Sequence, residues 1–302
     1  MKILLTGATG FVGKALLPHL IRAEHEITLL SRQPHNGEIQ EIIANKLMWA
    51  QEVHGKKFDL CIHLAWITTP GIYLDSPVND RFADATIRLA EGLFADGLPH
   101  FLALGTCLEY APHQILPCNE NTTPISPVST YAKSKERARL GIAEAAKRHG
   151  AGYTWARLFH LYGLGEDPKR IPSTFLRTLR EGNPLLLKTP QAIKDWIEIS
   201  DVTSALILLA EIETPQFEVN LGTGCGVSIN ALAETISSIS QSNPNLIKIS
   251  ENPDIDLYHT HIADITKLIR AGWRPTVDIN RGIQRLCSEV GLLGMMPPSV
   301  MG

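Results

Sequence analysis

The feature that most constrains the fold is a glycine-rich segment close to the N-terminus. An apolar run, Lys2–Thr6, leads directly into Gly7-Ala8-Thr9-Gly10-Phe11-Val12-Gly13, and an amphipathic stretch follows. The glycines allow a tight turn between a strand and a helix, and they let backbone N–H groups approach a pyrophosphate. The N-terminus of the helix adds a dipole that favours the same anion. The segment therefore predicts a dinucleotide site; the alternative is a tight turn without a ligand.

Short apolar runs alternate with longer amphipathic ones along most of the chain. The expected strands are residues 2–6, 26–30, 60–65, 101–105, 153–158 and 218–221. The expected helices are residues 12–23, 79–95 and 131–149. Repeated strand–helix–strand units of this kind predict an α/β fold with a doubly wound parallel sheet of the Rossmann type.

The pattern loosens in the C-terminal half, where residues 164–194 are rich in proline, lysine and arginine. We expect residues 1–163 and 195–225 to form the dinucleotide-binding domain. Residues 164–194 and 226–302 are expected to form a smaller, discontinuous substrate lobe over the C-terminal edge of the sheet.

The composition excludes several classes of protein. The 302 residues carry a formal charge of −3, and 44% of them are hydrophobic. Disordered chains have fewer apolar residues and a larger net charge, and nucleic-acid binders usually show a basic block. No apolar stretch approaches the roughly 20 residues of a membrane span. We therefore expect a folded protein that binds neither nucleic acid nor membrane.

The five cysteines are widely spaced and include no C-x-x-C pair. This spacing argues against zinc and dithiol-redox sites and fits a reducing compartment, so we expect a cytoplasmic protein. The apolar run before the glycine turn is too short for the core of a signal peptide. His259 and His261 alternate as on a strand and are candidates to line a pocket. No third ligand lies at a spacing typical of a metal site, so no metal is expected.

The end of the second expected strand bears on the choice of cofactor. NAD sites usually place an acidic residue there for the ribose 2′-hydroxyl, whereas an arginine suits the 2′-phosphate of NADP. Here the strand ends in Ser31-Arg32, with no Asp or Glu. We therefore expect a preference for NADP(H), with NAD(H) as the alternative. The competing interpretation is an exposed arginine in a loop.

A candidate catalytic group lies further along the chain. Tyr131 and Lys135 are four residues apart on an expected helix, so they share one face. A nearby ammonium can lower the pKa of a phenol and let it act as an acid or base near neutral pH. Thr106 follows an expected strand, where its hydroxyl could hydrogen-bond a substrate oxygen. The Y-x-x-x-K spacing is common in ordinary helices, but its combination with the glycine segment and a strand-end Thr favours catalysis.

With these motifs, the sequence resembles the extended short-chain dehydrogenase/reductase family, which includes nucleotide-sugar epimerases, dehydratases and reductases. The resemblance covers essentially the whole chain. The matching segments are residues 6–13, 62–65, 131–135, 157–163, 194–197, 200–202 and 220–224. It implies a Rossmann domain with a discontinuous sugar-nucleotide lobe, and a homodimer formed through the helices at 79–95 and 131–149.

The resemblance also implies roles for individual residues. Thr106, Tyr131 and Lys135 fall on the family's catalytic Ser/Thr, Tyr and Lys. The implied cofactor-binding residues are Gly7, Thr9, Gly10, Phe11, Val12, Gly13, Ser31, Arg32, Leu64, Ala65, Tyr131, Lys135 and Leu158. The implied substrate-binding residues are Trp66, Cys107, Leu108, His160 and Lys194.

Cations for the substrate's diphosphate are sought in the C-terminal lobe. Lys194 matches a family position that meets the phosphates. Arg170, Arg177 and Arg180 are additional candidates, although a charged helix face explains at least two of them equally well. Asp201, near an expected helix start, is interpreted as a structural N-cap.

Two departures from the family pattern narrow the chemistry. The 4,6-dehydratases carry an Asp-Glu pair after the catalytic Thr, and here those positions are Cys107 and Leu108. Neither is a carboxyl acid or base, so 4,6-dehydration is disfavoured. His160 replaces an Asn that normally helps to hold the substrate, which marks a changed pocket. The competing interpretation of His160 is a packed structural residue. Cys107 could act as a nucleophile or a second acid, but a small residue that lines the pocket is the favoured interpretation.

The leading expectation is NADPH-dependent reduction of the C4 keto group of a nucleotide-linked 4-keto-6-deoxy sugar, in deoxysugar biosynthesis. The segment around Trp66 and the sequence Gly-Thr-Cys-Leu-Glu-Tyr at 105–110 most resemble reductases of that kind. An NADP(H) preference supports net reduction, because epimerases of the family generally retain NAD. A nucleotide-sugar 4-epimerase is the alternative, and a non-catalytic dinucleotide-binding regulator is a third hypothesis.

Overall fold

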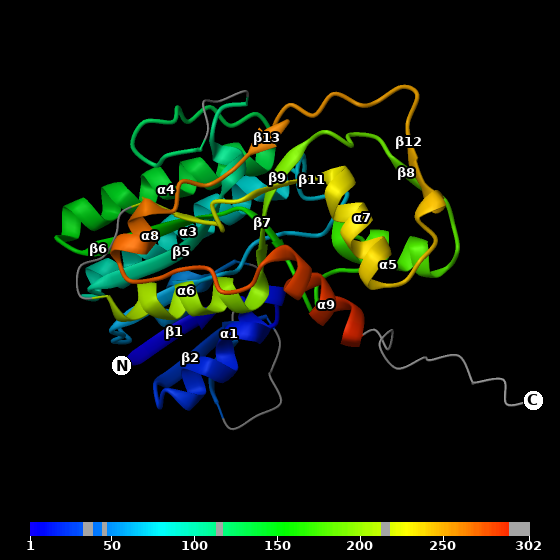
Figure 1. Ribbon diagram of the computed structural model, residues 1–302. Helices are drawn as coiled ribbons and strands as arrows, with labels where there is room; N and C mark the ends of the chain where they lie inside the picture. The colour runs from blue at the N-terminus through cyan, green and yellow to red at the C-terminus, as the bar shows by residue number, and fades with distance from the viewer. Residues whose placement is uncertain (33–38, 44–46, 113–116, 213–217, 290–302) are drawn as a thin grey trace, which may run out of the picture.

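The structure is a computed structural model that describes residues 1–32, 39–43, 47–112, 117–212 and 218–289. Residues 290–302, which were expected in the C-terminal lobe, lie outside the described residues. Figure 1 shows a large sheet with helices on both sides and a smaller group of helices and short strands beside it.

The larger part is built on a parallel sheet of seven strands. These strands are β1 (Lys2–Thr6), β2 (Glu26–Ser31), β3 (Gln40–Ile43), β4 (Leu60–His63), β5 (His100–Thr106), β6 (Gly152–Leu158) and β10 (Glu218–Leu221). Their spatial order is β10-β6-β5-β4-β1-β2-β3. The chain therefore builds outward from β1 to β3 in one direction and from β4 to β10 in the other. This order confirms the doubly wound, Rossmann-type α/β fold.

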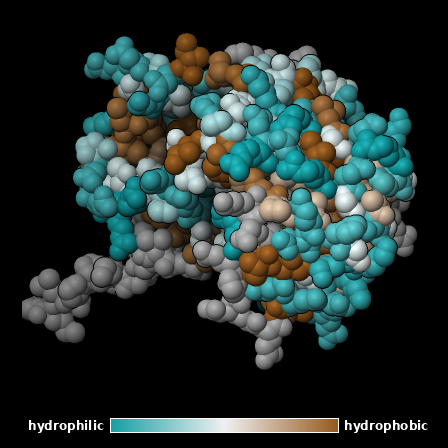
Figure 2. Space-filling view, turned by 180° about the vertical axis from the view of Figure 1, so that it is seen from behind, coloured by the Kyte–Doolittle hydropathy of each residue, from teal (hydrophilic) through white to brown (hydrophobic). Residues whose placement is uncertain are grey.

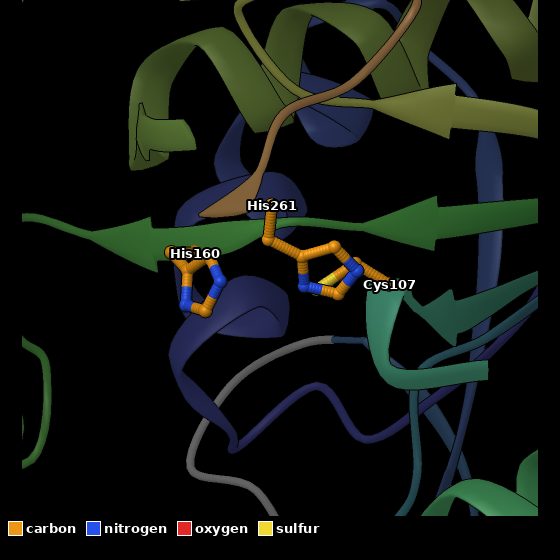
Figure 3. Close-up of side chains that lie close together, drawn as sticks. All are labelled: Cys107, His160 and His261. Carbon is orange, nitrogen blue, oxygen red and sulfur yellow. The ribbon is translucent and has the colours of Figure 1, made fainter. Parts of the chain in front are cut away.

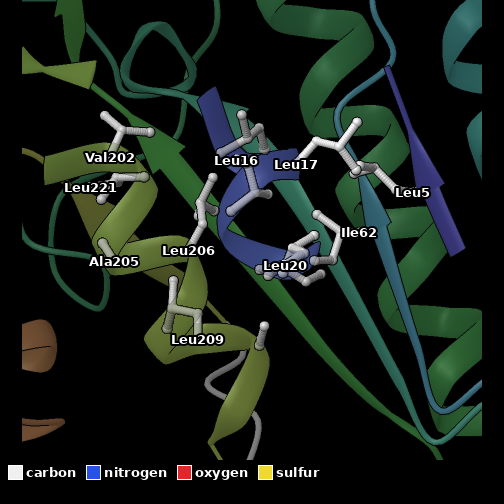
Figure 4. Packing of buried hydrophobic residues seen from close by; sticks show 14 of the residues in the cluster. Leu5, Leu16, Leu17, Leu20, Ile62, Val202, Ala205, Leu206, Leu209 and Leu221 are labelled. Atoms are coloured by element: carbon white, nitrogen blue, oxygen red, sulfur yellow. The ribbon is translucent and has the colours of Figure 1, made fainter. Parts of the chain in front are cut away.

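Helices cover both faces of this sheet (Figure 1). They are α1 (Phe11–Arg22), α2 (Trp49–Val53), α3 (Val78–Ala95), α4 (Thr130–His149) and α6 (Ile199–Glu211). Helices α1 and α6 share one hydrophobic core with the sheet, and Figure 4 shows Leu16 and Leu206 packed within it. Helices α2, α3 and α4 share the core on the other face. Because both faces are covered, the central strands are apolar on both sides, as parallel strands usually are.

The smaller part gathers most of the remaining elements around its own core. They are β7 (His160–Tyr162), α5 (Ile171–Arg180), β8 (Leu185–Leu187), β9 (Ile193–Glu198), β11 (Gly226–Ser228), α7 (Ile229–Ile239), β12 (Ile247–Ile249), β13 (Thr260–His261) and α9 (Ile279–Glu289). Strand β9 pairs with β7, β11 and β13, and β8 pairs with β12. Phe175, Leu232 and Ile283 are buried together on α5, α7 and α9. The short helix α8 (Thr266–Arg270) instead packs near β10 of the large sheet.

Asp201 does not have the expected capping role. The N-cap of α6 is Glu198, whose carboxylate accepts from the Ser200 N–H at 2.8 Å. Asp201 lies in the first turn, is buried, and accepts hydrogen bonds from the backbone N–H groups of Thr276 and Val277. The N-cap interpretation was wrong because Asp201 fastens a distant loop to α6 rather than its own helix start.

Figure 2 shows one face of the surface, on which hydrophobic residues form several separate patches among hydrophilic ones. None of the described helices is both long enough and apolar enough to cross a membrane.

Candidate active site

A cavity of about 810 Å³ opens at the carboxyl edge of the seven-stranded sheet. Its wall includes residues that directly follow β1, β2, β4, β5 and β6. These strands flank the point where the strand order reverses, which is where open α/β sheets bind ligands. The expected site residues in this wall are Gly7, Thr9, Gly10, Phe11, Val12, Gly13, Ser31, Arg32, Leu64, Ala65, Trp66, Thr106, Cys107, Leu108, Tyr131, Lys135, Leu158 and His160.

The charge lining this cavity is of one sign. Among the described residues, the charged ones in the wall are Arg32, Arg81, Lys135, Lys169 and Arg170, and no Asp or Glu joins them. The chain as a whole carries a charge of −3. The cationic wall is therefore a local feature, and it suits an anionic ligand.

Two glycines of the N-terminal loop are required by close backbone packing. Gly7 has a φ of +73°, and a Cβ there would lie 2.7 Å from the backbone nitrogen of Ala65. A Cβ on Gly13 would lie 2.2 Å from the carbonyl oxygen of Gly7. Both distances are too short for real atoms, so a side chain at either position would push the loop away from β4 or α1. The loop keeps its shape only with glycine at these two positions.

A buried hydrogen-bonded group holds this loop against β4. The Thr6 hydroxyl lies 2.9 Å from Nδ1 of His63 and accepts from the N–H groups of Leu64 and Ala65 at 3.2 and 3.1 Å. Nε2 of His63 lies 2.9 Å from the Thr86 hydroxyl. Burial lowers the pKa of His63 to about 3, so the ring is neutral at neutral pH. Sequence reasoning missed this group because its three side chains are far apart in the chain.

The start of α1 is open to the cavity. Its N-cap is Gly10, which has no side chain to accept hydrogen bonds from the first turn, and that turn contains no acidic residue. Thr9, Gly10, Phe11 and Val12 all line the cavity. Uncapped N–H groups at a helix start, together with the helix dipole, favour an anion such as a pyrophosphate. The loop and helix start therefore fit a dinucleotide.

Thr106, Tyr131 and Lys135 are brought together by two elements. Thr106 ends β5, and the other two lie on the first turns of α4. The hydroxyl of Ser129 accepts from the Ala132 N–H at 3.2 Å, which caps α4 and sets where it begins. All three side chains reach the wall of the cavity, and all three are buried.

Lys135 is held by neutral partners. Its Nζ donates to the carbonyl oxygen of Leu104 at 2.8 Å and lies 3.8 Å from the centre of the Trp66 ring. Burial lowers the pKa of Lys135 to about 7, and the negative charge of Glu109 acts in the opposite direction. Lys135 therefore gives up its proton more readily than an exposed lysine does.

The expected depression of the Tyr131 pKa is not found. Burial raises the pKa of Tyr131, the nearby Tyr73 raises it further, and a hydrogen bond with Thr106 acts in the opposite direction. Desolvation dominates because the phenolate would be buried without a strong counter-charge. Tyr131 is consequently a neutral phenol, which is the form that can donate a proton.

A buried carboxylate below the site was not anticipated. Glu109 is fully buried, accepts from the Thr106 N–H at 2.8 Å and forms a salt bridge with Nε of Arg157 at 2.8 Å. It also accepts from the indole of Trp155. The signal was present in the sequence, because a Thr followed three residues later by a Glu is the pattern of a capping box. Glu109 thus positions Thr106 through its backbone.

Lys194 is not among the residues that line the cavity. It is buried, and its Nζ lies 2.8 Å from a carboxylate oxygen of Asp256. The ammonium of Lys194 is thus engaged by Asp256 and by the carbonyl oxygen of Tyr258. Arg170 and Lys169 do line the cavity and replace Lys194 as candidate phosphate contacts.

Cys107 belongs to a cluster of three side chains that sequence spacing did not suggest (Figure 3). One ligand atom each from Cys107, His160 and His261 lies within 4.8 Å of the other two. Burial raises the pKa of the Cys107 thiol and lowers the pKa of both histidines, that of His261 to about 4. Both imidazoles are therefore neutral at neutral pH.

Together, the fold and the cavity are those of a dinucleotide-binding protein of the Rossmann type, with Thr106, Tyr131 and Lys135 in the cavity wall. Residues 3–222 match the NAD dependent epimerase/dehydratase family. The chain belongs to this family and is an enzyme of the extended short-chain dehydrogenase/reductase type.

Known relatives match over nearly the whole chain. "Putative UDP-glucose 4-epimerase" of Methanocaldococcus jannaschii is 25% identical, with 94% of this chain and 96% of that protein covered. UDP-glucuronic acid decarboxylase 5 of Arabidopsis thaliana is 26% identical, with 94% and 87% covered.

Among solved structures, the UDP-glucose 4-epimerase of Thermotoga maritima with UDP-glucose matches with a TM-score of 0.83 and 20% identity, covering 96% of this chain and 99% of that chain. The UDP-glucose 4-epimerase of Thermus thermophilus in complex with NAD matches with a TM-score of 0.81 and 21% identity, covering 98% and 100%. Likeness at this level of identity establishes the fold.

Proposed function

We propose that this enzyme reduces the C4 keto group of a nucleotide-linked 4-keto-6-deoxy sugar with NADPH. The observation that carries the proposal is the cavity that joins Thr106, Tyr131 and Lys135 to the glycine loop within a wall that bears only cationic charge among the described residues. A dinucleotide and a nucleotide-linked sugar are both strongly anionic, and both suit that wall.

The cofactor, when bound, supplies the hydride for the keto carbon. The chain's own residues hold and protonate the oxygen of that carbon. Tyr131, as a neutral phenol, gives its proton to the oxygen as negative charge develops there. The Thr106 hydroxyl donates a hydrogen bond to the same oxygen, where stabilisation matters most. Lys135, whose Nζ lies 6.0 Å from the centre of the Tyr131 ring, would bind the nicotinamide ribose.

Two observations support net reduction. The neutral form of Tyr131 is the one that reduction consumes, whereas oxidation of a sugar alcohol requires the phenolate. Ser31 and Arg32 line the cavity at the end of β2, where an arginine suits the 2′-phosphate of NADP. Cys107 and Leu108, which follow Thr106, contain no carboxyl group that could serve a 4,6-dehydration.

A nucleotide-sugar 4-epimerase is the second candidate, and the comparisons favour it at least as strongly. The relative from Methanocaldococcus jannaschii carries a 4-epimerase name, and two of the matching structures are UDP-glucose 4-epimerases. An epimerase would oxidise C4 and reduce it again from the opposite face with the same Tyr131 and Thr106, without net use of cofactor. The NAD in the Thermus thermophilus structure supports NAD(H) as the cofactor of that alternative.

The remaining proposals concern the organisation of the enzyme. We propose that the domain expected at residues 1–163 and 195–225 binds NADP and that the lobe expected at residues 164–194 and 226–302 selects the sugar nucleotide. The described fold departs from these bounds at three elements: β7 (His160–Tyr162) and β9 (Ile193–Glu198) pair within the smaller part, and α8 (Thr266–Arg270) packs near β10. A homodimer through α3 and α4, a cytoplasmic location and a role in deoxysugar biosynthesis belong to the same proposal.

One assay separates the candidates. The enzyme is incubated with CDP-, dTDP-, GDP- and UDP-linked 4-keto-6-deoxyglucose and NADPH, and product and NADP⁺ are both quantified. A reductase forms one NADP⁺ for each sugar reduced. Interconversion of UDP-glucose and UDP-galactose without net cofactor change would replace the first proposal with the second. Tight dinucleotide binding with no turnover of any substrate, and no effect of Tyr131→Phe, would contradict both.

A further inference from the structure

Three side chains with metal-binding chemistry converge beside the cavity (Figure 3). Cys107 begins the turn after β5, His160 begins β7 and His261 ends β13. Their ligand atoms lie within 4.8 Å of one another. In a tetrahedral zinc site, ligand atoms about 2.0–2.3 Å from the metal stand roughly 3.3–3.8 Å apart. Small side-chain rotations, of about an ångström at each ligand atom, would close the group around one ion.

Strand pairing explains why the two histidines meet. In the register of the small sheet, His160 lies opposite Trp196 of β9, and His261 lies opposite Lys194 of the same strand. Residues two apart on a strand point to the same face, and directly paired residues on neighbouring strands do so as well. Both histidines therefore project from one face of this sheet, and their ring centres are 5.9 Å apart.

The imidazoles have free coordinating atoms in a buried place. His261 is 2% exposed, and neither of its ring nitrogens makes a well-formed hydrogen bond, although the backbone of Cys107 lies close enough to raise the pKa of the ring slightly against the effect of burial. Nε2 of His160 is likewise buried without a partner. Buried polar atoms are almost always paired, so these nitrogens are available to an ordered water or to a metal ion. Tyr258 stacks on the His261 ring at 5.1 Å, and Phe159 lies 5.4 Å from it, which holds the ring in place.

Charged groups around the cluster limit what it can bind. The ammonium of Lys194 lowers the pKa of all three side chains and would repel a bound cation. Its charge is partly balanced by a salt bridge with Asp256 at 2.8 Å. The positive charge of Arg170 lowers the pKa of His160, whereas the negative charge of the buried Asp195 carboxylate raises the pKa of Cys107. One thiolate ligand reduces the net charge of a bound dication from +2 to +1, and this weakens its repulsion by Lys194 and Arg170.

We propose that Cys107, His160 and His261 form a binding site for one borderline divalent cation of the Zn²⁺ class. A sulfur and two imidazole nitrogens are the ligand set that Zn²⁺ prefers over Mg²⁺ or Ca²⁺. The thiol proton of Cys107 leaves to solvent when the metal–sulfur bond forms. Because Cys107 and His160 line the cavity, the remaining coordination position faces it and is open to water or to an oxygen of a bound ligand.

The test uses the full chain, freed of metal with a chelator, and Co²⁺ as a spectroscopic probe. Titration of the wild type is expected to give a thiolate-to-cobalt charge-transfer band and tetrahedral d–d bands that saturate at one Co²⁺ per chain and disappear when Zn²⁺ is added. Cys107→Ser is expected to abolish the charge-transfer band, and His261→Gln to weaken Co²⁺ binding by more than about 100-fold, the upper end of what loss of a mere supporting partner costs.

Matched controls lie close by in the chain. Cys225 is an exposed thiol and His259 an exposed imidazole two residues from His261, so Cys225→Ser and His259→Gln should leave both bands and the stoichiometry unchanged. Thermal melting is a second measurement, for variants that are too unstable for the Co²⁺ titration. Zn²⁺ should raise the melting temperature of the wild type and of both control variants, but not that of Cys107→Ser. The proposal is overturned if the wild type shows no saturable band, if the band survives in Cys107→Ser, or if Cys225→Ser removes it. None of these readouts depends on the sugar substrate.

Discussion

The glycine loop and the histidine corner are built in opposite ways. The glycine loop (residues 7–13) is one continuous segment, and it presents backbone N–H groups at the start of α1. The histidine corner (Cys107, His160 and His261) draws one side chain from each of three segments and presents side-chain sulfur and nitrogen. The first arrangement tolerates change in side chains but not in backbone geometry. The second depends on strand register, so its chemistry can change by single substitutions while the fold persists.

The largest effect is expected at Tyr131, which lines the same cavity as the glycine loop. Tyr131→Phe removes the proton donor, and kcat should fall by about 100- to 10,000-fold. The affinity for dinucleotide should change little, because the ring remains. Steady-state kinetics and dinucleotide titration measure the two quantities. Tyr73→Phe is the control, since its ring centre is only 4.8 Å away in the same cavity; an equal loss of kcat in that variant would contradict the assignment.

One added methyl group at Gly13 should displace the glycine loop. In Gly13→Ala the new Cβ would meet the Gly7 carbonyl oxygen at 2.2 Å, so the loop must move. Overpacking of this kind costs about 1–3 kcal/mol in the free energy of unfolding and should also abolish tight dinucleotide binding. Gly92→Ala, in α3, places its Cβ 3.8 Å from Ala50 and should be neutral or stabilising by up to about 1 kcal/mol. Chemical denaturation and dinucleotide titration of both variants test the contrast, and intact binding in Gly13→Ala would refute it.

His63, in the hydrogen-bonded group that holds the glycine loop against β4, should make the stability of the protein depend on pH. The pKa of His63 is lowered to about 3 in the folded state, whereas an unfolded histidine titrates near pH 6.5. Below pH 6.5 the unfolded state therefore binds the extra proton, and folding loses stability as the pH falls. Between pH 7 and pH 5 this one residue should cost about 2 kcal/mol.

Urea denaturation at the two pH values measures that loss. In His63→Gln the pH-dependent loss should shrink by about the same amount, whatever the variant's stability at pH 7. His54→Gln is the control, because the His54 side chain is 82% exposed. An unchanged pH dependence in His63→Gln would show that the ring is not kept neutral.

The smallest effect is expected at Arg32, which follows β2 in the cavity wall. Arg32→Ala should weaken NADPH binding by about tenfold, the value of one charge-assisted contact, and leave NADH binding nearly unchanged. Arg22→Ala, an exposed position on α1, should affect neither cofactor. Fluorescence titration with both cofactors decides the matter. An equal loss for NADH and NADPH would remove the basis for the NADP preference.

Several elements of the large sheet and its helices could be predicted almost residue by residue. Strands β1 and β10 have the expected bounds, and α1, α3 and α4 begin one residue earlier than expected. Local signals suffice there, because a buried parallel strand is a continuous apolar run and a helix carries its own caps. Strand β3 was missed because its four residues are all partly or fully exposed and lack such a run.

The histidine corner and the buried supports could not be predicted in the same way. Lys194 was assigned to phosphate from its position in a motif, yet Asp256, more than 60 residues away, draws it into a salt bridge. The pKa of Tyr131 was expected to fall, and burial raises it. Each of these outcomes depends on neighbours that are distant in sequence and on desolvation, neither of which a local pattern contains.

By itself the sequence determined the class of fold and the place of the glycine loop, and it singled out Thr106, Tyr131 and Lys135 as candidate catalytic residues. These features depend on local backbone geometry and on spacing within single elements. Only the tertiary structure decided which side chains face one another. It gathered cations around the cavity of a chain with a net charge of −3, set Glu109 beneath Thr106, and brought Cys107, His160 and His261 together. The physical reason is that strand order and register, not sequence proximity, determine which residues share a face and how far water is excluded from them.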